Sequence, residues 1–331
     1  RTLSCLLLAT LLAACGGTES DVGERNAGLT SVGPIFVLQT LKVMTLNVRR
    51  QGSGDPEPWA ARLPMLQNMV LYHRPHVIGV QELHVDTLMD FANAIDHNQP
   101  GRYVHHWIKR DSGGEGIAIF WDSQRFQLRG MGYKNTKNSE RLKKCSWWEG
   151  KFRSDKKRRP IQHLILRDLS SQREFMVLNT HFPSKHHCER RGMAKIFADY
   201  MTANKGSTER IIALGDFNDG IEADGRLNKS YDELLQHTGL FNAYGKTNPL
   251  DPTGAFSTSN HWDRENRRGR MIDHILVSDL SPVWTSKVDR SMFVATGHRY
   301  DCPNLICSNG RPARQMRLYS DHWAVVATLW P

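Results

Sequence analysis

Residues 214–220 are LGDFNDG, and they directly follow the apolar residues Ile211–Ala213. β-Branched and apolar residues that end in Gly, Asp and Asn indicate a buried strand that reaches the edge of its sheet. An isolated Asp or Asn after a strand is more often a turn former, and Asp-Gly is a common turn dipeptide. The stretch therefore predicts either a plain turn or a strand that holds Asp216 and Asn218 rigidly at a cleft.

The rest of the sequence alternates short apolar runs with amphipathic segments. Residues 41–48, 76–82, 116–121, 161–167, 174–181, 272–278 and 322–330 are rich in β-branched and aromatic side chains, which predicts strands. Residues 60–73, 86–95 and 190–201 space apolar side chains three and four apart, which predicts helices. Because there is no convincing repeat or break in composition, one mixed α/β domain is favoured over two.

Polar residues of metal-ligand type gather at the ends of these runs. Asn47, Glu82, His181 and Asp216 stand at C-terminal ends, whereas Asp273, Asp321 and His322 stand at N-terminal ends. Such ends can share one rim only if the sheets contain antiparallel pairs, which disfavours a purely parallel sheet. Carboxylates, amides and histidines on one rim are the groups that phosphate chemistry with a hard cation requires.

Six short motifs carry these residues: LNV at 46–48, QE at 81–82, NTHF at 179–182, GDFN at 215–218, IDHILVS at 272–278 and SDHWAVV at 320–326. In this order they resemble the motifs of the endonuclease/exonuclease/phosphatase superfamily, which includes deoxyribonuclease I. The resemblance extends from about Lys42 to Trp330. It implies an α/β fold, a four-layered α/β sandwich of two mixed sheets flanked by helices, and a metal-dependent phosphodiesterase.

The resemblance implies a magnesium site. Glu82 matches the principal Mg2+ ligand, Asn47 lies beside it, and Asp321 matches another carboxylate near the ion. Oxygen ligands of this kind are what Mg2+ prefers. Mn2+ is an alternative ion, and a structural Ca2+ is a further option.

The resemblance also implies catalytic roles. Asp216 and Asn218 match the pair that positions the attacking water and the phosphate. His322 matches the catalytic histidine, and Asp273 matches the carboxylate that orients it. Which group acts as general acid and which as general base stays open at this point.

Three further residues are assigned through the resemblance. His181 matches a second active-site histidine, with Glu115 as its loosely aligned partner. Arg159 resembles a phosphate-binding arginine. The stretch Lys134–Arg159 leads into it with eleven Lys or Arg and three acidic residues, a net charge of +8.

This basic stretch, the formal charge of +10 and the pI near 9.4 favour a polyanion as partner. A deoxyribonuclease-like endonuclease that acts on DNA as a monomer is therefore the leading hypothesis. Trp147 and Trp148 beside lysines favour instead a sphingomyelinase-like enzyme at a membrane. A non-catalytic binding or toxin-like module is the alternative from another class, and the apparently complete site argues against it.

The N-terminal residues predict export. A basic start and an apolar run end in Leu12-Ala13-Ala14-Cys15, which resembles the bacterial lipobox with Cys15 as the lipidated residue. We expect a signal peptide at 1–14, a flexible Gly-rich tether at 15–35 and a single domain at 36–331. This implies a lipid-anchored outer-membrane protein of the bacterial cell envelope. An ordinary secretory signal, giving a secreted or periplasmic protein, and a buried helix are the alternatives.

Four cysteines follow the tether, and an even number in an exported protein indicates two disulfides. The short separation favours Cys302 with Cys307, which leaves Cys145 with Cys188. A metal site formed by all four is the rival, although the sequence lacks close CxxC pairs.

Peptide mass mapping of the nonreduced protein from a bacterial host tests both expectations. We expect acyl chains on Cys15 at the mature N-terminus, and two linked peptide pairs that join Cys302 to Cys307 and Cys145 to Cys188. Free thiols at all four positions would refute the disulfides, and an unmodified terminus elsewhere would refute the anchor.

Overall fold

The computed structural model describes residues 40–96, 99–136, 142, 159–222, 226–247, 257–262, 270–279, 283–289, 292–293, 299–300 and 318–330. Residues Val37–Pro331 form one compact unit. The predicted signal peptide and tether, Trp147, Trp148 and most of the basic stretch lie outside the described residues. So do Cys145, Cys302 and Cys307, and the predicted cysteine pairs therefore stay predictions.

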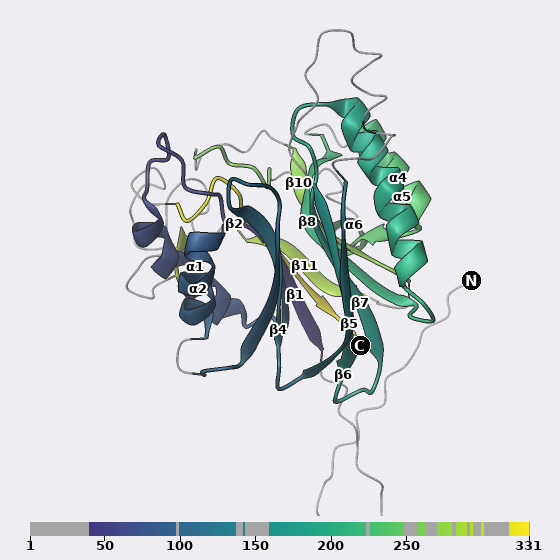
Figure 1. Ribbon diagram of the computed structural model, residues 1–331, viewed down its shortest axis with the longest axis horizontal. Helices are drawn as coiled ribbons and strands as arrows, with labels where there is room; N and C mark the ends of the chain where they lie inside the picture. Colours follow the sequence, from purple (N-terminus) through teal and green to yellow (C-terminus); the bar gives the residue numbers. More distant parts are fainter. Residues whose placement is uncertain are drawn as a thin grey trace, which may run out of the picture. The chain divides into compact units, whose positions relative to one another are not determined.

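Two six-stranded sheets form the centre of this unit (Figure 1). In spatial order, the first contains β11 (Val283–Asp289), β14 (Ala324–Leu329), β1 (Leu41–Asn47), β2 (Val77–His84), β4 (Glu115–Asp122) and β3 (Tyr103–Lys109). The second contains β5 (Phe126–Asn135), β6 (Pro160–Asp168), β7 (Glu174–His181), β8 (Arg210–Ile221), β10 (Met271–Val277) and β9 (Phe241–Asn242). A small separate sheet pairs β12 (Met292–Phe293) with β13 (Arg299–Tyr300).

Both large sheets are mixed. Strand β1 runs parallel to β2 and antiparallel to β14, and β8 runs parallel to β7 and antiparallel to β10. Strands that enter a sheet in opposite directions bring their opposite ends to the same edge. The antiparallel pairs expected from the polar residues at the strand ends are therefore confirmed.

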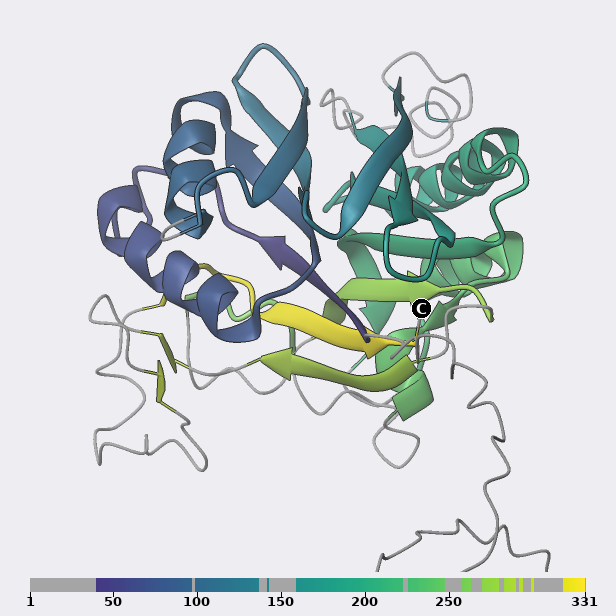
Figure 2. The same cartoon turned by 90° about the horizontal axis from the view of Figure 1, so that it is seen from below.

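Helices cover the outer faces of the sheets. Figure 2 shows α1 (Trp59–His73) and α2 (Val85–Ile95) on the first sheet, and α4 (His187–Asn204) and α5 (Lys229–Thr238) on the second; the short α6 (Ala243–Thr247) follows β9. Their buried apolar residues face the sheets. The predicted four-layered α/β sandwich is confirmed. Among the described residues, no helix is long and apolar enough to cross a membrane.

All eight strands and all three helices expected from the sequence are present, with shifts of a few residues at their ends. Strands β3, β5 and β11 and helix α5 were not predicted, and neither were the short elements β9, β12, β13 and α6. The sequence of β3, YVHHWIK, has two half-buried histidines between its buried residues Tyr103 and Ile108, and most of β5 is exposed. Neither strand therefore shows a clear apolar pattern. His322 lies two residues before β14, where it forms an isolated bridge with Ser259 rather than beginning the strand.

The inner faces of the two sheets meet closely between β2 and β8. A Cβ atom on Gly79 would lie 2.6 Å from the Cβ atom of Leu214, so only glycine fits there. Nearby, the buried amide of Asn179 in β7 donates to the carbonyls of Val80 at 3.0 Å and Ala118 at 2.8 Å. These two contacts fix how β2 and β4 lie against β7 and β8.

Replacing Gly79 with Ala is expected to destabilise the fold because the added methyl group has no room beside Leu214. Overpacking of a core typically costs about 1–3 kcal/mol. Chemical denaturation measures the change, with Gly54→Ala as the matched control, because no atom lies within 4 Å of a Cβ there. Equal stability of the two variants would contradict this view of the sheet contact.

Candidate active site

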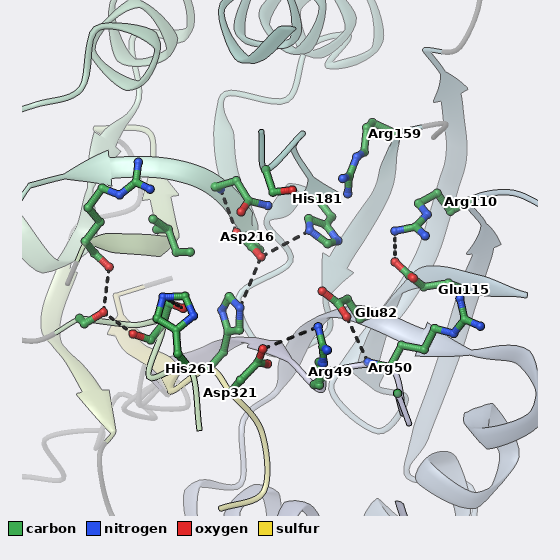
Figure 3. A pocket seen from close by; sticks show the side chains of 18 of the residues that line it. Arg49, Arg50, Glu82, Arg110, Glu115, Arg159, His181, Asp216, His261 and Asp321 are labelled. Atoms are coloured by element: carbon green, nitrogen blue, oxygen red, sulfur yellow. Dashed lines mark hydrogen bonds and ion pairs between the residues drawn. The ribbon is translucent and has the colours of Figure 1, made fainter. Parts of the chain in front are cut away.

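One cleft of about 900 Å3 receives residues from both sheets. Its walls include eight of the predicted site residues: Glu82, Glu115, Arg159, His181, Asp216, Asn218, Asp321 and His322 (Figure 3). Asn47 and Asp273 are fully buried and hydrogen bond to cleft residues. The structure therefore brings the ten predicted active-site residues together.

Glu82 is directed into the cleft by an irregularity in β2. The pairing of β2 with β4 shifts at this residue, and its φ of 59° is unusual for a residue other than glycine. Bulges of this kind re-aim side chains and are enriched at functional sites. Burial raises the pKa of Glu82, but the His322 charge and hydrogen bonds from Asn47 and the Arg50 N–H outweigh it and lower the pKa below 4.5. Glu82 is thus held as an anion, the form that binds a metal ion.

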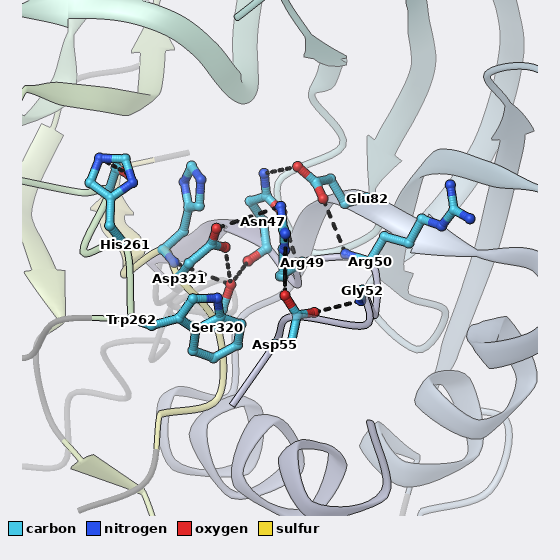
Figure 4. A network of polar contacts seen from close by, with 12 residues as sticks. Asn47, Arg49, Arg50, Gly52, Asp55, Glu82, His261, Trp262, Ser320 and Asp321 are labelled. Carbon is cyan, nitrogen blue, oxygen red and sulfur yellow. Dashed lines mark hydrogen bonds and ion pairs between the residues drawn. The ribbon is translucent and has the colours of Figure 1, made fainter. Parts of the chain in front are cut away.

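Asn47 connects the two sheets beside the cleft. Figure 4 shows its hydrogen bond to Glu82. Its Nδ2 donates to Glu82 at 3.2 Å and to Asp216 at 3.0 Å, and its Oδ1 accepts the N–H of Arg49 at 2.9 Å. The amide oxygen keeps a second lone pair. Asn47 positions two carboxylates in this arrangement, and its Oδ1 could bind an ion while it accepts the bond from Arg49.

Asp216 lies at the centre of the cleft. One carboxylate oxygen accepts the Asn218 N–H at 2.8 Å, and the other lies 3.5 Å from Nε2 of His181 and 3.9 Å from Nε2 of His322. Burial, together with the nearby charge of Asp273, raises the pKa of Asp216 to about 7. A carboxylate with such a pKa exchanges a proton readily near neutral pH, as a general base or acid must.

His322 and Asp273 form a buried pair. Nδ1 of His322 donates to Asp273 at 2.8 Å, which leaves Nε2 facing Asp216. The backbone N–H of Asp273 donates to Thr258 Oγ1 at 3.0 Å, which fixes the carboxylate in place. Burial lowers the pKa of His322, but Asp273, Asp216 and Asp321 raise it well above 6.5. The predicted orientation of His322 by Asp273 is therefore present in the geometry.

The remaining predicted residues lie on the cleft walls. Asp321 is 3.8 Å from the Arg49 guanidinium, and burial raises its pKa. Arg159 is almost fully buried immediately before β6. Glu115 forms a buried ion pair with Arg110. Its predicted pairing with His181 stays a prediction.

Sequence reasoning missed several cationic or ionisable residues of the cleft: Arg49, Arg50, Arg110, His261 and Arg270. Two of them, Arg49 and Arg50, stand two and three residues after Asn47 in LNVRR, which offered a signal. The others lie on segments without a recognisable motif, and only the fold brings them to the cleft.

The charge state of His322 gives a test of this geometry. In EDTA-treated protein we expect the imidazole to remain protonated well above pH 6.5, because the Asp273 carboxylate stabilises its cation. The pair then stabilises the fold fully below pH 6.5, and this contribution is lost as the pH rises through the folded pKa. Asp273→Asn should lower the pKa of His322, because the amide keeps the shape but not the charge.

NMR titration of the histidine Cε1–H signals measures this change. His274 is the internal control, since burial lowers its pKa to about 4 and it should stay neutral over the same range. A folded-state pKa of His322 at or below 6.5 would contradict the assigned pair.

The fold has many relatives among solved structures. A mannosyl-6-phosphatase from Bacteroides thetaiotaomicron shares 22% identity at a TM-score of 0.67, covering 87% of this chain and 99% of that one. The human Nocturnin catalytic domain with bound sulfate shares 17% identity at a TM-score of 0.59, covering 88% and 94%. A humanized TDP2 from D. rerio shares 14% identity at 0.56, covering 88% and 98%. No curated protein matches the chain.

The family comparison agrees with the site. The model of the Endonuclease/Exonuclease/phosphatase family matches residues 44–322, a span that contains all ten of the residues gathered at the cleft. Members of this family are hydrolytic phosphoesterases that depend on metal ions, so the chain is expected to use the cleft for that chemistry. The protein belongs to the Endonuclease/Exonuclease/phosphatase family.

Proposed function

We propose that the protein is a Mg2+-dependent phosphodiesterase that cleaves DNA as an endonuclease. The observation that carries the proposal is the central contact of the cleft, where Asp216 faces His322 and its partner Asp273. Glu82 and Arg159 line the same cleft. A phosphodiester under attack accumulates negative charge, and these residues provide both groups that transfer protons and groups that stabilise charge.

The residues fit a hard divalent cation. Glu82 is an ionised carboxylate, and Asp321 adds a second oxygen donor on the same wall. A second arrangement is offered by Asp216, Asp273 and His322, whose ligand atoms lie within 4.8 Å of one another. The first set is preferred because it consists of carboxylate oxygens, which Mg2+ favours over an imidazole nitrogen. When bound, Mg2+ would stabilise charge on the phosphate and the leaving oxygen.

The protein's own residues account for the remaining requirements. Asp216, with a pKa of about 7, is the candidate base for the attacking water. The His322 cation is placed to stabilise a phosphate oxygen, and Asp273 keeps it charged and oriented. Asn218 has a φ of 50° and donates its amide to the Phe182 carbonyl at 2.9 Å, so its place at the cleft is fixed.

DNA is favoured by charge. Five arginines line the cleft: Arg49, Arg50, Arg110, Arg159 and Arg270. The basic stretch Lys134–Arg159 leads into one of them, and the whole chain carries +10. Neutralising several backbone phosphates at once is how proteins bind DNA without reading its sequence.

We also propose that lipidated Cys15 anchors the enzyme in the bacterial envelope, which the peptide map described above tests.

The test is hydrolysis of plasmid DNA, RNA, sphingomyelin, an inositol phosphate and mannose 6-phosphate by the purified protein. We expect Mg2+-dependent nicking of the plasmid, loss of activity with EDTA and recovery with added Mg2+. His322→Ala should lower turnover by about 10² to 10³, the loss expected when one group that stabilises charge in the transition state is removed. His237→Ala, on the exposed end of α5, is the matched control.

Other outcomes would change the assignment. Hydrolysis of sphingomyelin or of the monoesters without cleavage of DNA would refute the endonuclease. Full activity of a stable His322→Ala variant would show that this histidine only supports the fold, and a melting curve on the same sample separates that case from unfolding.

A further inference from the structure

Arginines, and one histidine, lie on two opposite sides of the reactive centre. In Figure 3, His261 lies on one side of Asp216, and Arg50 and Arg110 lie on the other. Arg270 shares the side of His261, because its carbonyl accepts the Thr258 N–H at 3.3 Å from the segment that carries this histidine. A substrate with a single phosphate at the centre does not need positive charge on both sides.

On the side of Arg50 and Arg110, the two arginines differ: Arg110 is paired with carboxylates, whereas Arg50 is exposed to solvent. Arg110 forms ion pairs with Asp111 at 3.0 Å and with Glu115, so its charge is already balanced. Arg50 is exposed, and in the described part of the chain no ion pair involves its guanidinium. Its backbone N–H donates to Glu82 at 3.1 Å, which holds the residue next to the predicted metal ligand.

On the opposite side, the segment that carries His261 has a strained backbone that hydrogen bonds hold in place. His261 and Trp262 have φ values of 52° and 63°, which residues other than glycine seldom adopt. The segment is fixed by Asn260, whose N–H donates to the Asp321 carbonyl at 2.7 Å and whose Oδ1 accepts the Trp262 N–H at 2.8 Å. Strain of this kind persists where the surroundings impose it, often at binding sites.

Arg270 supplies the available charge on this side. Its guanidinium lies 3.9 Å from Glu222, and both side chains are well exposed, so the pair is weak. Arg50 and Arg270 are therefore two exposed cleft arginines, one on each side, that a bound anion could engage with little competition from carboxylates.

We infer that Arg50 and Arg270 bind the backbone phosphates on either side of the scissile phosphate, so that the substrate is a nucleic acid strand that crosses the cleft. This inference rests on the proposed function and adds the residues that select a chain over a short phosphodiester. Contacts of this type position a strand without reading its bases. His261 lies on the same side of the cleft as Arg270, so the strand that binds Arg270 would also pass this histidine.

The experiment compares three substrates: bis(p-nitrophenyl) phosphate, a DNA dinucleotide and a single-stranded DNA 12-mer. In the wild-type enzyme, kcat/KM should rise from the first to the last, because only the 12-mer carries phosphates on both sides. Arg50→Gln and Arg270→Gln should each lower kcat/KM on the 12-mer by about tenfold, the loss expected for one charge-assisted hydrogen bond. The loss on bis(p-nitrophenyl) phosphate should be several times smaller.

Salt dependence gives an independent readout. Each variant should reduce the log–log slope of 12-mer binding against salt by about 0.7, the value for one phosphate contact on a single strand. Arg129→Gln is the matched control, because Arg129 is a half-exposed arginine of β5 with an equally loose partner, Glu174 at 3.7 Å. It should change neither the slope nor kcat/KM.

The outcomes separate this inference from the proposed function. Failure to hydrolyse any of the three phosphodiesters would overturn the proposed function. Hydrolysis with no dependence on chain length, or with equal effects of Arg50→Gln, Arg270→Gln and Arg129→Gln, would leave the phosphodiesterase intact and overturn the two flanking phosphate sites.

Discussion

The close contact between the two sheets determines the geometry of the cleft. Gly79 lets β2 approach Leu214 of β8, and the amide of Asn179 donates to carbonyls of both β2 and β4 while its oxygen accepts from Gln81 at 2.8 Å. A buried amide whose bonds are all satisfied fixes direction as well as distance, which apolar packing alone does not do. The two sheets cannot slide past each other without leaving these groups unpaired.

This constraint reaches the active site through short lengths of strand. Each active-site residue comes two positions after a residue of the sheet contact: Glu82 after Val80, His181 after Asn179, and Asp216 after Leu214. The candidate metal ligand and the candidate base therefore come from different sheets, yet their separation is set by the same contact. Asn47 then joins Glu82 to Asp216 directly through hydrogen bonds of 3.2 and 3.0 Å.

The site also concentrates charge that is costly to bury. Asp216 and Asp273 lie close together away from solvent, and the His322 cation and the hydrogen bonds from Asn218 and Asn47 to Asp216 offset their repulsion. Such an arrangement lowers the stability of the ionised protein, and the result is a carboxylate with a pKa near neutrality. Left-handed backbone at Glu82, Asn218 and His261 adds conformational strain in the same region. The layered core supplies the stability that this strain requires.

The sequence by itself determined the layers and the identity of the central groups. Strand β8 was predictable because IIAL is apolar, although the strand continues past Asp216 to Ile221. The mixed sheets followed from polar residues at opposite ends of the predicted runs. These features depend on neighbours along the chain. The motif residues were found because each occupies a fixed place beside a strand.

Only the tertiary structure decided how these groups act. The burial that raises the pKa of Asp216, the hydrogen bonds that turn the Asn47 amide toward two carboxylates, and the placement of Arg50 opposite Arg270 all involve residues far apart in sequence. Desolvation and Coulomb interactions depend on distance in space, and a sequence pattern carries no information about that distance until the chain has folded.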